Sequence, residues 1–305
     1  MSAPTIRKPT PFDLSLLLFL TLVWSSSFIA IKVAVPETGP TWLTATRIVI
    51  GFVVLLPWSL YRGIILPKSV KAWANIVIIS LLNVSVPFLL ISWAELTISA
   101  GIASLLLGTG PLLSLIFAHL TTHDDKFNRN KLIGILLGFA GIALVVGNEA
   151  IKAMGSSSVI AMLAILGASL SYAISGAMIR QVKDIPPTRL ATLILGLASL
   201  EMIALAALEG TPDFAAISMS AWGSLAFLGL LPTGLATILR YRLIWAIGAS
   251  FFSLGMNLIP VFGVILGALI LSEQVAITTW AALGLILAGL LVARRPAKSR
   301  PGDSH

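Results

Sequence analysis

Long apolar runs alternate with short polar connections along most of the chain. A helix needs about 20 mainly apolar residues to cross the hydrocarbon core of a bilayer, so each run predicts a membrane-spanning helix. The pattern predicts an all-α integral membrane protein with ten such helices, and no connection is long enough for a soluble domain. The expected helices cover 12–35, 41–61, 72–94, 98–120, 130–148, 157–179, 188–208, 217–239, 245–271 and 276–293.

Composition supports the membrane assignment. The 305 residues are 57% hydrophobic and 10% charged, whereas soluble domains carry about 25% charged residues. The net charge of +8 is explained by basic residues that set the orientation of the helices in the membrane. Nucleic acid is therefore not an expected partner. The chain has no cysteine, which excludes disulfides, thiol catalysis and cysteine-ligated metals.

Basic residues gather in alternate connections. Cytoplasmic loops are enriched in lysine and arginine, so the pattern predicts cytoplasmic tails at 1–11 and 294–305. Arg7 and Lys8 precede an apolar run that is too long for a cleaved signal peptide, so we expect a retained first helix. The 17 of 20 basic residues on the predicted inner side are Arg7, Lys8, Arg62, Lys68, Lys71, Lys126, Arg129, Lys131, Arg180, Lys183, Arg189, Arg240, Arg242, Arg294, Arg295, Lys298 and Arg300.

The two halves of the chain resemble each other. Residues 100–120 align with 249–269, so that Pro111 falls on Pro260, and the stretch 24–32 lies opposite 172–180. A repeat of this period indicates duplication. We expect halves at 12–148 and 157–293 with five helices each. Because five is odd, the second half would be inverted in the membrane.

Prolines within the predicted helices mark expected kinks at Pro87, Pro111, Pro232 and Pro260. A proline leaves the carbonyl four residues earlier without its helical N–H partner. Pro111 and Pro260 would free the carbonyls of Leu107 and Met256. Such a carbonyl must face protein or a wet cavity, so matched kinks favour a central transport site. The alternative is a packing kink whose carbonyl bonds a neighbouring serine or threonine.

Polar and aromatic side chains on these helices are candidates for a substrate cavity. Such a set would suit a small, partly apolar solute. The alternative is that they form hydrogen bonds and close contacts between helices. The pairs Gly134–Gly138 and Gly263–Gly267 are also expected to let helices pack closely. The cavity candidates are Trp24, Ser25, Ser27, Asn83, Tyr172, Ser175 and Asn257.

Apart from residues at the cytoplasmic ends, three charged residues fall inside the predicted helices, all in the outer half: Lys32, Arg47 and Glu201. Charges at membrane depth are functional candidates. They could form ion pairs that close an outer gate, for example Glu201 with Arg47, or they could bind a zwitterion. The alternatives are snorkelling of Lys32 to the interface and a structural pair for Arg47.

Other chemistry is not indicated. His119 and His123 have a spacing that can bind a metal, but we expect a solvated turn at that helix end and predict neither a metal site nor a cofactor. The sequence contains no phosphate-binding loop of the GxxxxGK[ST] type and no paired acids at membrane depth. An enzyme is therefore not expected, and a membrane enzyme is the remote alternative.

Three motifs carry a resemblance to a known family. WSSSFIAIK (24–32), TISAGIASLLLGTGPLLSLIFAHL (97–120) and LSEQVAITTWAALGLILAGLLVA (271–293) resemble the first, fourth and last helices of the drug/metabolite transporter superfamily, in its EamA-type ten-helix branch. The likeness covers about 12–293. Ser25 stands where many members have glycine, and Asp124 and Asp125 where many have glutamate.

The resemblance implies two inverted five-helix repeats and export of amino acids or other small metabolites. Its narrower implication is an exporter similar to the YddG type, for aromatic and other neutral amino acids. We therefore predict a secondary transporter of the bacterial inner membrane that works by alternating access, by uniport or exchange, with proton coupling open. The alternative is another small solute or a drug.

Overall fold

The computed structural model describes residues 7–121, 129–152, 157–182 and 184–293. Every regular element in these ranges is a helix, which confirms that the fold is all-α as predicted. The tail at 294–305, most of the tail at 1–11 and His123 lie outside the described residues, as does the side chain of His119. The predicted cytoplasmic tails therefore stay predictions.

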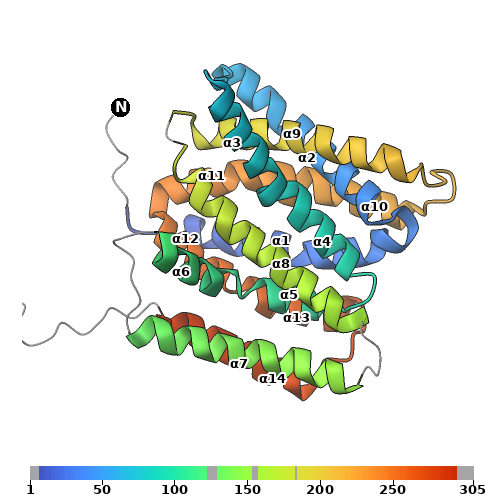
Figure 1. The fold of residues 1–305 in the computed structure, drawn as a ribbon, viewed down its shortest axis with the longest axis vertical. Helices are drawn as coiled ribbons and strands as arrows, with labels where there is room; N and C mark the ends of the chain where they lie inside the picture. The colour runs from blue at the N-terminus through green and yellow to red at the C-terminus, as the bar shows by residue number, and fades with distance from the viewer. Residues whose placement is uncertain (1–6, 122–128, 153–156, 183, 294–305) are drawn as a thin grey trace, which may run out of the picture.

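The described residues of the first half form seven α-helices and a π-helical segment, η1 (Figure 1). Several begin with a hydrogen-bonded cap, as at Thr10, Ser69 and Ser99, where a side-chain oxygen accepts from the first turn. The elements are α1 (Pro11–Thr38), α2 (Pro40–Arg62), α3 (Val70–Ser80), η1 (Leu81–Ser85), α4 (Val86–Ala94), α5 (Ala100–Leu107), α6 (Gly110–Thr121) and α7 (Arg129–Lys152).

The second half has the same order of elements from its first helix onward. Its π-helical segment, η2, again interrupts a long helix, and its broken helix again precedes the last one. The elements are α8 (Ser157–Ile179), α9 (Pro187–Glu209), α10 (Met219–Leu228), η2 (Gly229–Leu235), α11 (Ala236–Ile247), α12 (Ala249–Met256), α13 (Ile259–Ile270) and α14 (Ile277–Ala293).

Seven of the helices in the described ranges are long and apolar enough to cross a membrane. Three apolar helices of the same part of the chain are shorter, Ala100–Ile116, Ile259–Ile270 and Ile277–Ala293. The count of ten spans and the inverted symmetry therefore stay predictions. The seven long helices are Pro11–Thr38, Pro40–Arg62, Val70–Ala94, Arg129–Gly147, Ser157–Ile179, Pro187–Glu209 and Met219–Ile247.

One predicted boundary is wrong. The helix expected at 217–239 continues through α11 to Ile247, so Arg240 and Arg242 lie on a helix and not in a loop. Both side chains are exposed. Arginine is a good helix former, and its long stem lets the charge reach water from a helical position. Hydropathy therefore ended this helix too early.

The four prolines interrupt the helices in two ways. Pro87 is the second residue of α4, which follows η1, and Pro232 lies within η2. Pro111 and Pro260 stand in the first turn of α6 and α13, after short breaks that separate these helices from α5 and α12. Proline cannot donate the helical hydrogen bond, which explains why each regular helix stops near it. Each kind of interruption occurs once in each half.

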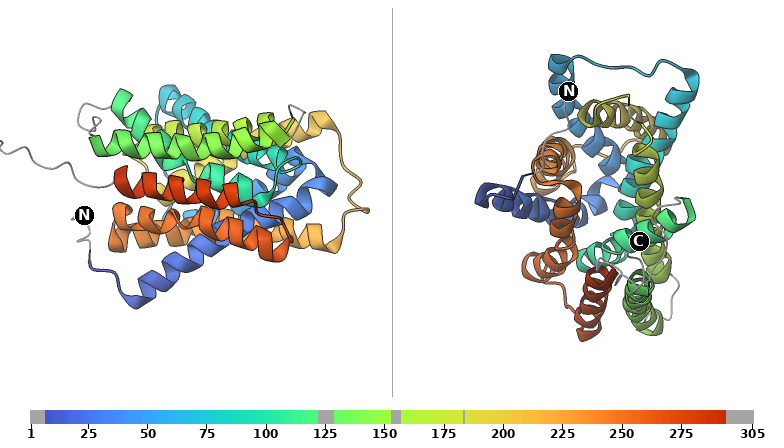
Figure 2. Two further views of the ribbon diagram at one scale, coloured as in Figure 1. Left: turned by 90° about the horizontal axis from the view of Figure 1, so that it is seen from below. Right: turned by 90° about the vertical axis from the view of Figure 1, so that its left-hand side faces the viewer.

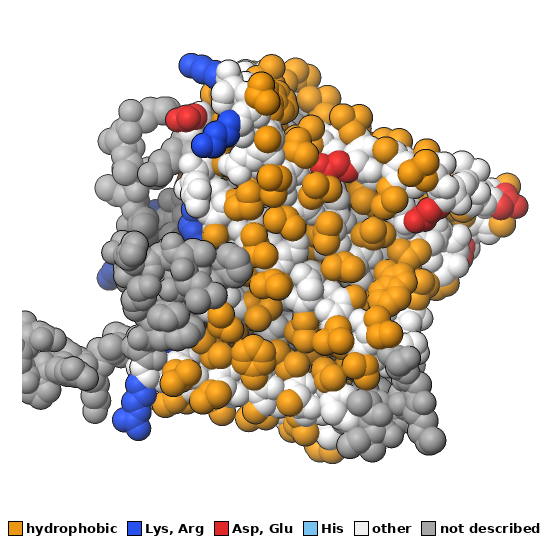
Figure 3. Space-filling model, viewed as in Figure 1, with side chains coloured by type: hydrophobic (Ala, Val, Ile, Leu, Met, Phe, Trp, Pro, Cys, Tyr) orange, Lys and Arg blue, Asp and Glu red, His pale blue; other side chains and the backbone are white. Residues whose placement is uncertain are grey.

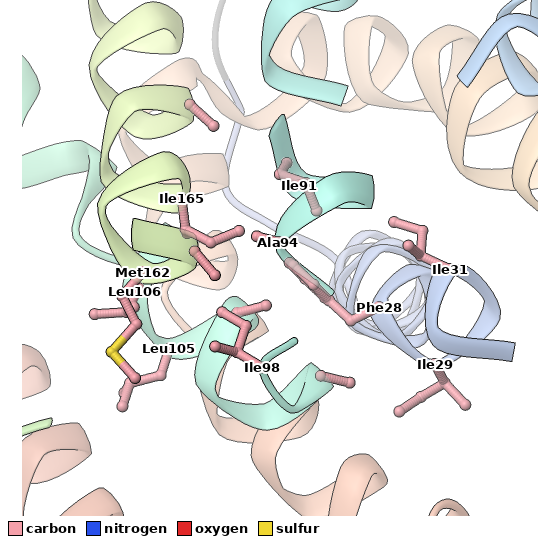
Figure 4. Close-up of a cluster of buried hydrophobic side chains, with 14 of the residues drawn as sticks. Phe28, Ile29, Ile31, Ile91, Ala94, Ile98, Leu105, Leu106, Met162 and Ile165 are labelled. Carbon is pink, nitrogen blue, oxygen red and sulfur yellow. The ribbon is translucent and has the colours of Figure 1, made fainter. Parts of the chain in front are cut away.

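Helices of the first half pack mainly against helices of the second half. The pairs are α1 with α10, α2 with α9, α4 with α8, α5 with α13 and α7 with α14. Figure 1 shows α7 and α14 side by side at the lower edge, and both views of Figure 2 agree. A buried apolar cluster joins α1, α4, α5 and α8, where Figure 4 shows Phe28, Ile91, Leu105 and Met162.

Glycines bring two of these pairs into close contact. A Cβ on Gly289 of α14 would lie 2.5 Å from the carbonyl oxygen of Gly134 on α7, and one on Gly263 would lie against the Ser104 side chain. Small residues let membrane helices approach closely. The packing role predicted from the glycine spacing at 134 and 263 is confirmed.

Charge is separated along the helix axes. In Figure 3 most lysine and arginine side chains in view lie at the left-hand edge, most acidic ones lie further right, and hydrophobic side chains cover the surface between. A broad apolar band between charged ends suits a protein surrounded by lipid.

Candidate functional site

A polar junction joins α2 to η2 in the interior. Arg47 is 6% exposed, and its Nε donates a hydrogen bond of 2.9 Å to Oγ1 of Thr233. Thr233 Oγ1 donates at 2.8 Å to the carbonyl of Leu228, the group that Pro232 leaves without a helical partner. The guanidinium carbon lies 3.9 Å from the centroid of the Phe88 ring. The π-helical turn thus positions Thr233, and Thr233 positions Arg47.

A second junction joins η1 to α8. Asn83 Nδ2 donates to Ser175 Oγ at 2.9 Å, so the structure brings two of the predicted cavity residues together. Ser171 Oγ donates at 2.8 Å to the carbonyl of Leu82 inside η1. Tyr172, on the same helix, is half-buried and lies within electrostatic range of Arg47. Each π-helical segment therefore forms polar contacts with a helix of the other half of the chain, η2 with α2 and η1 with α8.

The predicted residues of α1 contact the second half of the chain. Trp24 Nε1 donates to the carbonyl of Pro232 at 3.0 Å, and its ring meets Phe252 edge-on with centroids 6.2 Å apart. Ser25 Oγ donates at 3.1 Å to the carbonyl of Ile259, beside the break between α12 and α13. Ser27 bonds only within its own helix among the described contacts, to Val23. Ser25 thus makes a hydrogen bond between helices, which is the alternative to a role in the substrate cavity.

Asn257 lies in the break itself. It is 9% exposed, and its Oδ1 has no hydrogen-bond partner in the described part of the chain. Buried amide oxygens are nearly always bonded, so this atom is available to a ligand. The carbonyl freed by Pro111 is different: Ser169 Oγ donates to Leu107 O at 3.3 Å. At Pro111 the structure therefore shows a packing kink whose free carbonyl bonds a serine, which is the alternative to an open cavity.

Glu201 does not pair with Arg47. Its carboxylate accepts hydrogen bonds from Ser80, just before η1, and from Ser85, at the end of η1, the latter at 2.6 Å. The example of a gate formed by Arg47 and Glu201 is therefore not seen in this conformation. The reason is that Glu201 of α9 faces the α3–η1 junction, whereas Arg47 points from α2 toward η2.

Lys32 is bonded inside the protein. Its Nζ donates to the carbonyls of Glu95 at 2.5 Å and Ile98 at 2.8 Å, which follow the end of α4. Carbonyls at a helix C-terminus carry partial negative charge and attract cations. Lys32 therefore closes the turn between α4 and α5 and does not snorkel.

A groove of about 200 Å³ lies elsewhere, between α2 and α9. Its lining is almost entirely apolar, as at Phe52, Leu56 and Leu197, and includes none of the predicted site residues. It is therefore distinct from the polar junctions.

The sequence also matches known proteins. The EamA-like transporter family model matches residues 12–147 and again residues 159–295. The uncharacterised transporter YoaV of Bacillus subtilis is 25% identical over 275 residues, covering 90% of this chain and 91% of that protein. The uncharacterised inner membrane transporter YedA of Escherichia coli K12 is 26% identical, covering 88% and 86%. One solved crystal structure has a TM-score of 0.64 at 22% identity, covering 93% of this chain and 97% of its own, and shows the shared fold.

The chain belongs to the EamA-like transporter family. It is accordingly a multi-pass membrane transporter, which confirms the superfamily predicted from the motifs. The related transporters are uncharacterised, so the EamA-like assignment leaves the solute, the direction of transport and any coupling ion to be proposed.

Two residues of this EamA-like transporter were missed by sequence reasoning. Thr233 looked like an ordinary threonine beside a proline; the signal was its position one residue after Pro232, where its hydroxyl can reach the freed carbonyl. Glu95 directly follows the helix predicted at 72–94 and is therefore expected in a connection, but it is 0% exposed. A hydropathy profile shows that Glu95 ends an apolar run, but it contains no information on whether the following turn is buried by other helices.

Proposed function

We propose that this EamA-like protein exports amino acids, aromatic and other neutral ones, by alternating access between two inverted five-helix repeats. The observation that carries the proposal is that the polar contacts Arg47–Thr233, which is buried, and Asn83–Ser175 and Trp24–Pro232, which are partly buried, all join one half of the chain to the other. Movement of the halves against each other would break these contacts and free their polar groups for a solute.

The repeat proposal has two supports. The same family model matches each half of the chain. The helix pairs α2–α9 and α7–α14 each join elements at equivalent positions, and α1–α13 exchanges with α8–α6 under the same operation. This is the pattern expected of a pseudo-twofold axis in the membrane plane.

The chemistry of the junctions supports an amino acid as the solute. Arginine recognises carboxylates through its paired N–H groups, and only Nε of Arg47 is bonded among the described contacts. Phe88, Trp24 and Tyr172 offer aromatic surface for an apolar side chain. We place the solute between α1, α2, η1, α8 and η2, in an inner membrane with both tails in the cytoplasm.

The test is counterflow in proteoliposomes loaded with unlabelled amino acid. We expect saturable uptake of labelled tryptophan or phenylalanine, reduced at least about tenfold by R47Q, which removes a charge-assisted hydrogen bond. W24A should raise the half-saturating concentration. K71Q, at an exposed lysine, should behave as wild type. If the protein exchanged drugs but not amino acids, the proposed substrate class would be wrong. If it exchanged no solute at all, the proposed alternating-access transport would be wrong.

A further inference from the structure

Glu95 is a fully buried acid without a partner for its charge. The residue is 0% exposed, and neither carboxyl oxygen has a hydrogen-bond partner in the described part of the chain. Its backbone carbonyl, in contrast, accepts from Lys32. Buried polar groups almost always have partners, so each exception needs an explanation.

Two other acids at the same end of the helices show how a structural carboxylate is held here. Glu37 accepts from the N–H and Oγ of Ser218, at the start of α10, at 2.6 and 2.7 Å. Glu273 accepts from the N–H groups of Ala100 and Gly101, at the start of α5, at 2.7 and 3.0 Å. Both stabilise a helix N-terminus. Glu95 makes no such contact, so a capping role does not account for it.

The charged groups around Glu95 come from three elements. Lys32 on α1 and Arg47 on α2 are positive, and Glu273 before α14 is negative. Tyr172 on α8 lies within electrostatic range of Arg47. The ammonium of Lys32 is committed to two backbone carbonyls, and Nε of Arg47 is bonded to Thr233. An ionised carboxylate with no hydrogen bond is costly to bury, whereas a neutral carboxyl group is tolerated.

We propose that Glu95 is the proton-binding group that couples export to proton entry. The inference rests on the proposed function. In the closed conformation the carboxyl group carries a proton. When the outer end is open, a carboxylate oxygen of Glu95 forms an O–H bond with a proton from external water. When the inner side opens, that bond breaks and the proton passes to internal water, so one proton enters for each solute exported.

The ionised form has a partner within reach. The Lys32 ammonium already touches the backbone of Glu95, so a rearrangement of the α4–α5 turn that releases Lys32 lets it meet the carboxylate. Loss of the proton thus favours a different turn conformation from the one seen here. A ligand shifts a conformational equilibrium only by binding the two states differently, and a proton on Glu95 does so.

The experiment compares wild type, E95Q and the control E209Q in proteoliposomes. Glu209 is exposed at the end of α9, so E209Q should behave as wild type. With the membrane potential held at zero by valinomycin and equal potassium on both sides, an interior one pH unit more acidic than the medium should give about tenfold solute accumulation in wild type, because one proton leaves for each neutral solute that enters and one pH unit is a tenfold ratio of proton concentration. E95Q should retain counterflow at equal pH but show no accumulation driven by the pH gradient. E95D, which keeps a carboxyl group, should retain accumulation.

The outcomes separate the two proposals. Counterflow by wild type without any response to the pH gradient overturns proton coupling and leaves the transport proposal intact. Accumulation by E95Q equal to wild type overturns the assignment to Glu95. Absence of counterflow in wild type with every solute overturns the proposed function itself. If E95Q is not recovered as a folded protein, E95D serves as the test: accumulation that is retained but has a shifted dependence on pH supports the assignment, and a pH dependence identical to wild type contradicts it.

Discussion

Arg47 of α2 and Thr233 of η2, 186 positions apart, share a buried hydrogen bond from Nε to Oγ1. The same hydroxyl donates to the carbonyl freed by Pro232, so one threonine serves both the π-helical turn and the cation. Arg47 has no carboxylate partner among its described contacts. A buried arginine held by a hydroxyl and an aromatic ring keeps donors available for a solute anion.

Thr233→Val should destabilise the protein and lower its affinity for solute. Valine keeps the shape but leaves the carbonyl of Leu228 and Nε of Arg47 without partners, which costs about 1–3 kcal/mol for a buried group. Thermal unfolding in detergent and counterflow would measure both effects. The control is Thr237→Val, because Thr237 bonds only to the backbone of its own segment, at Thr233 O. Equal effects of the two variants would contradict the role of Thr233.

Ser85→Ala should destabilise the protein through Glu201. Ser80 and Ser85 both donate to this carboxylate, and loss of a hydrogen bond to a charged group costs about 1.5–3 kcal/mol. Combined with Glu201→Gln, the effects should be non-additive, with a coupling of about 0.5–3 kcal/mol. Ser199→Ala is the matched control, since Ser199 bonds to Leu195 O in its own helix. Additive effects at 85 and 201 would show that the contact is not formed.

Gly134→Ala should weaken the packing of α7 on α14. The new Cβ would lie 2.6 Å from the Cβ of Ala293 and against the carbonyl of Gly289, and overpacking of this kind costs about 1–3 kcal/mol. Gly284→Ala on α14 meets nothing within 4 Å, so it should be neutral or stabilising by up to about 1 kcal/mol. Thermal unfolding would rank the two variants, and a stable Gly134→Ala protein would refute the close crossing.

Single cysteines should map the topology without background, because the natural chain has no cysteine. Lys68→Cys and Gln181→Cys lie in exposed connections at the predicted cytoplasmic end. We expect them to react with a membrane-impermeant maleimide only after the cells are opened. Gln274→Cys and Ala215→Cys, exposed at the other end, should react in intact spheroplasts. Labelling of all four cysteines from the same side of the membrane would contradict the ten-span prediction.

Local features of the sequence were enough to predict the helices and their interruptions. Hydropathy located the apolar runs, because each must satisfy its backbone hydrogen bonds internally in lipid. The prolines at 87, 111, 232 and 260 located the breaks, because a missing N–H acts on its own helix. The glycine at 134 was correctly read as a packing residue for a similar reason, since its small size permits close approach whatever the partner.

Partners in the interior depended on contacts between residues far apart in the chain. No local pattern shows that Glu201 faces Ser80 and Ser85 and not Arg47, or that Lys32 binds the turn after α4. The sequence by itself determined a helical membrane transporter with matched kinks, because apolar length and missing N–H groups act locally. Only the tertiary structure decided which polar groups meet and that Glu95 is buried, because hydrogen-bond geometry and burial depend on how the two halves pack.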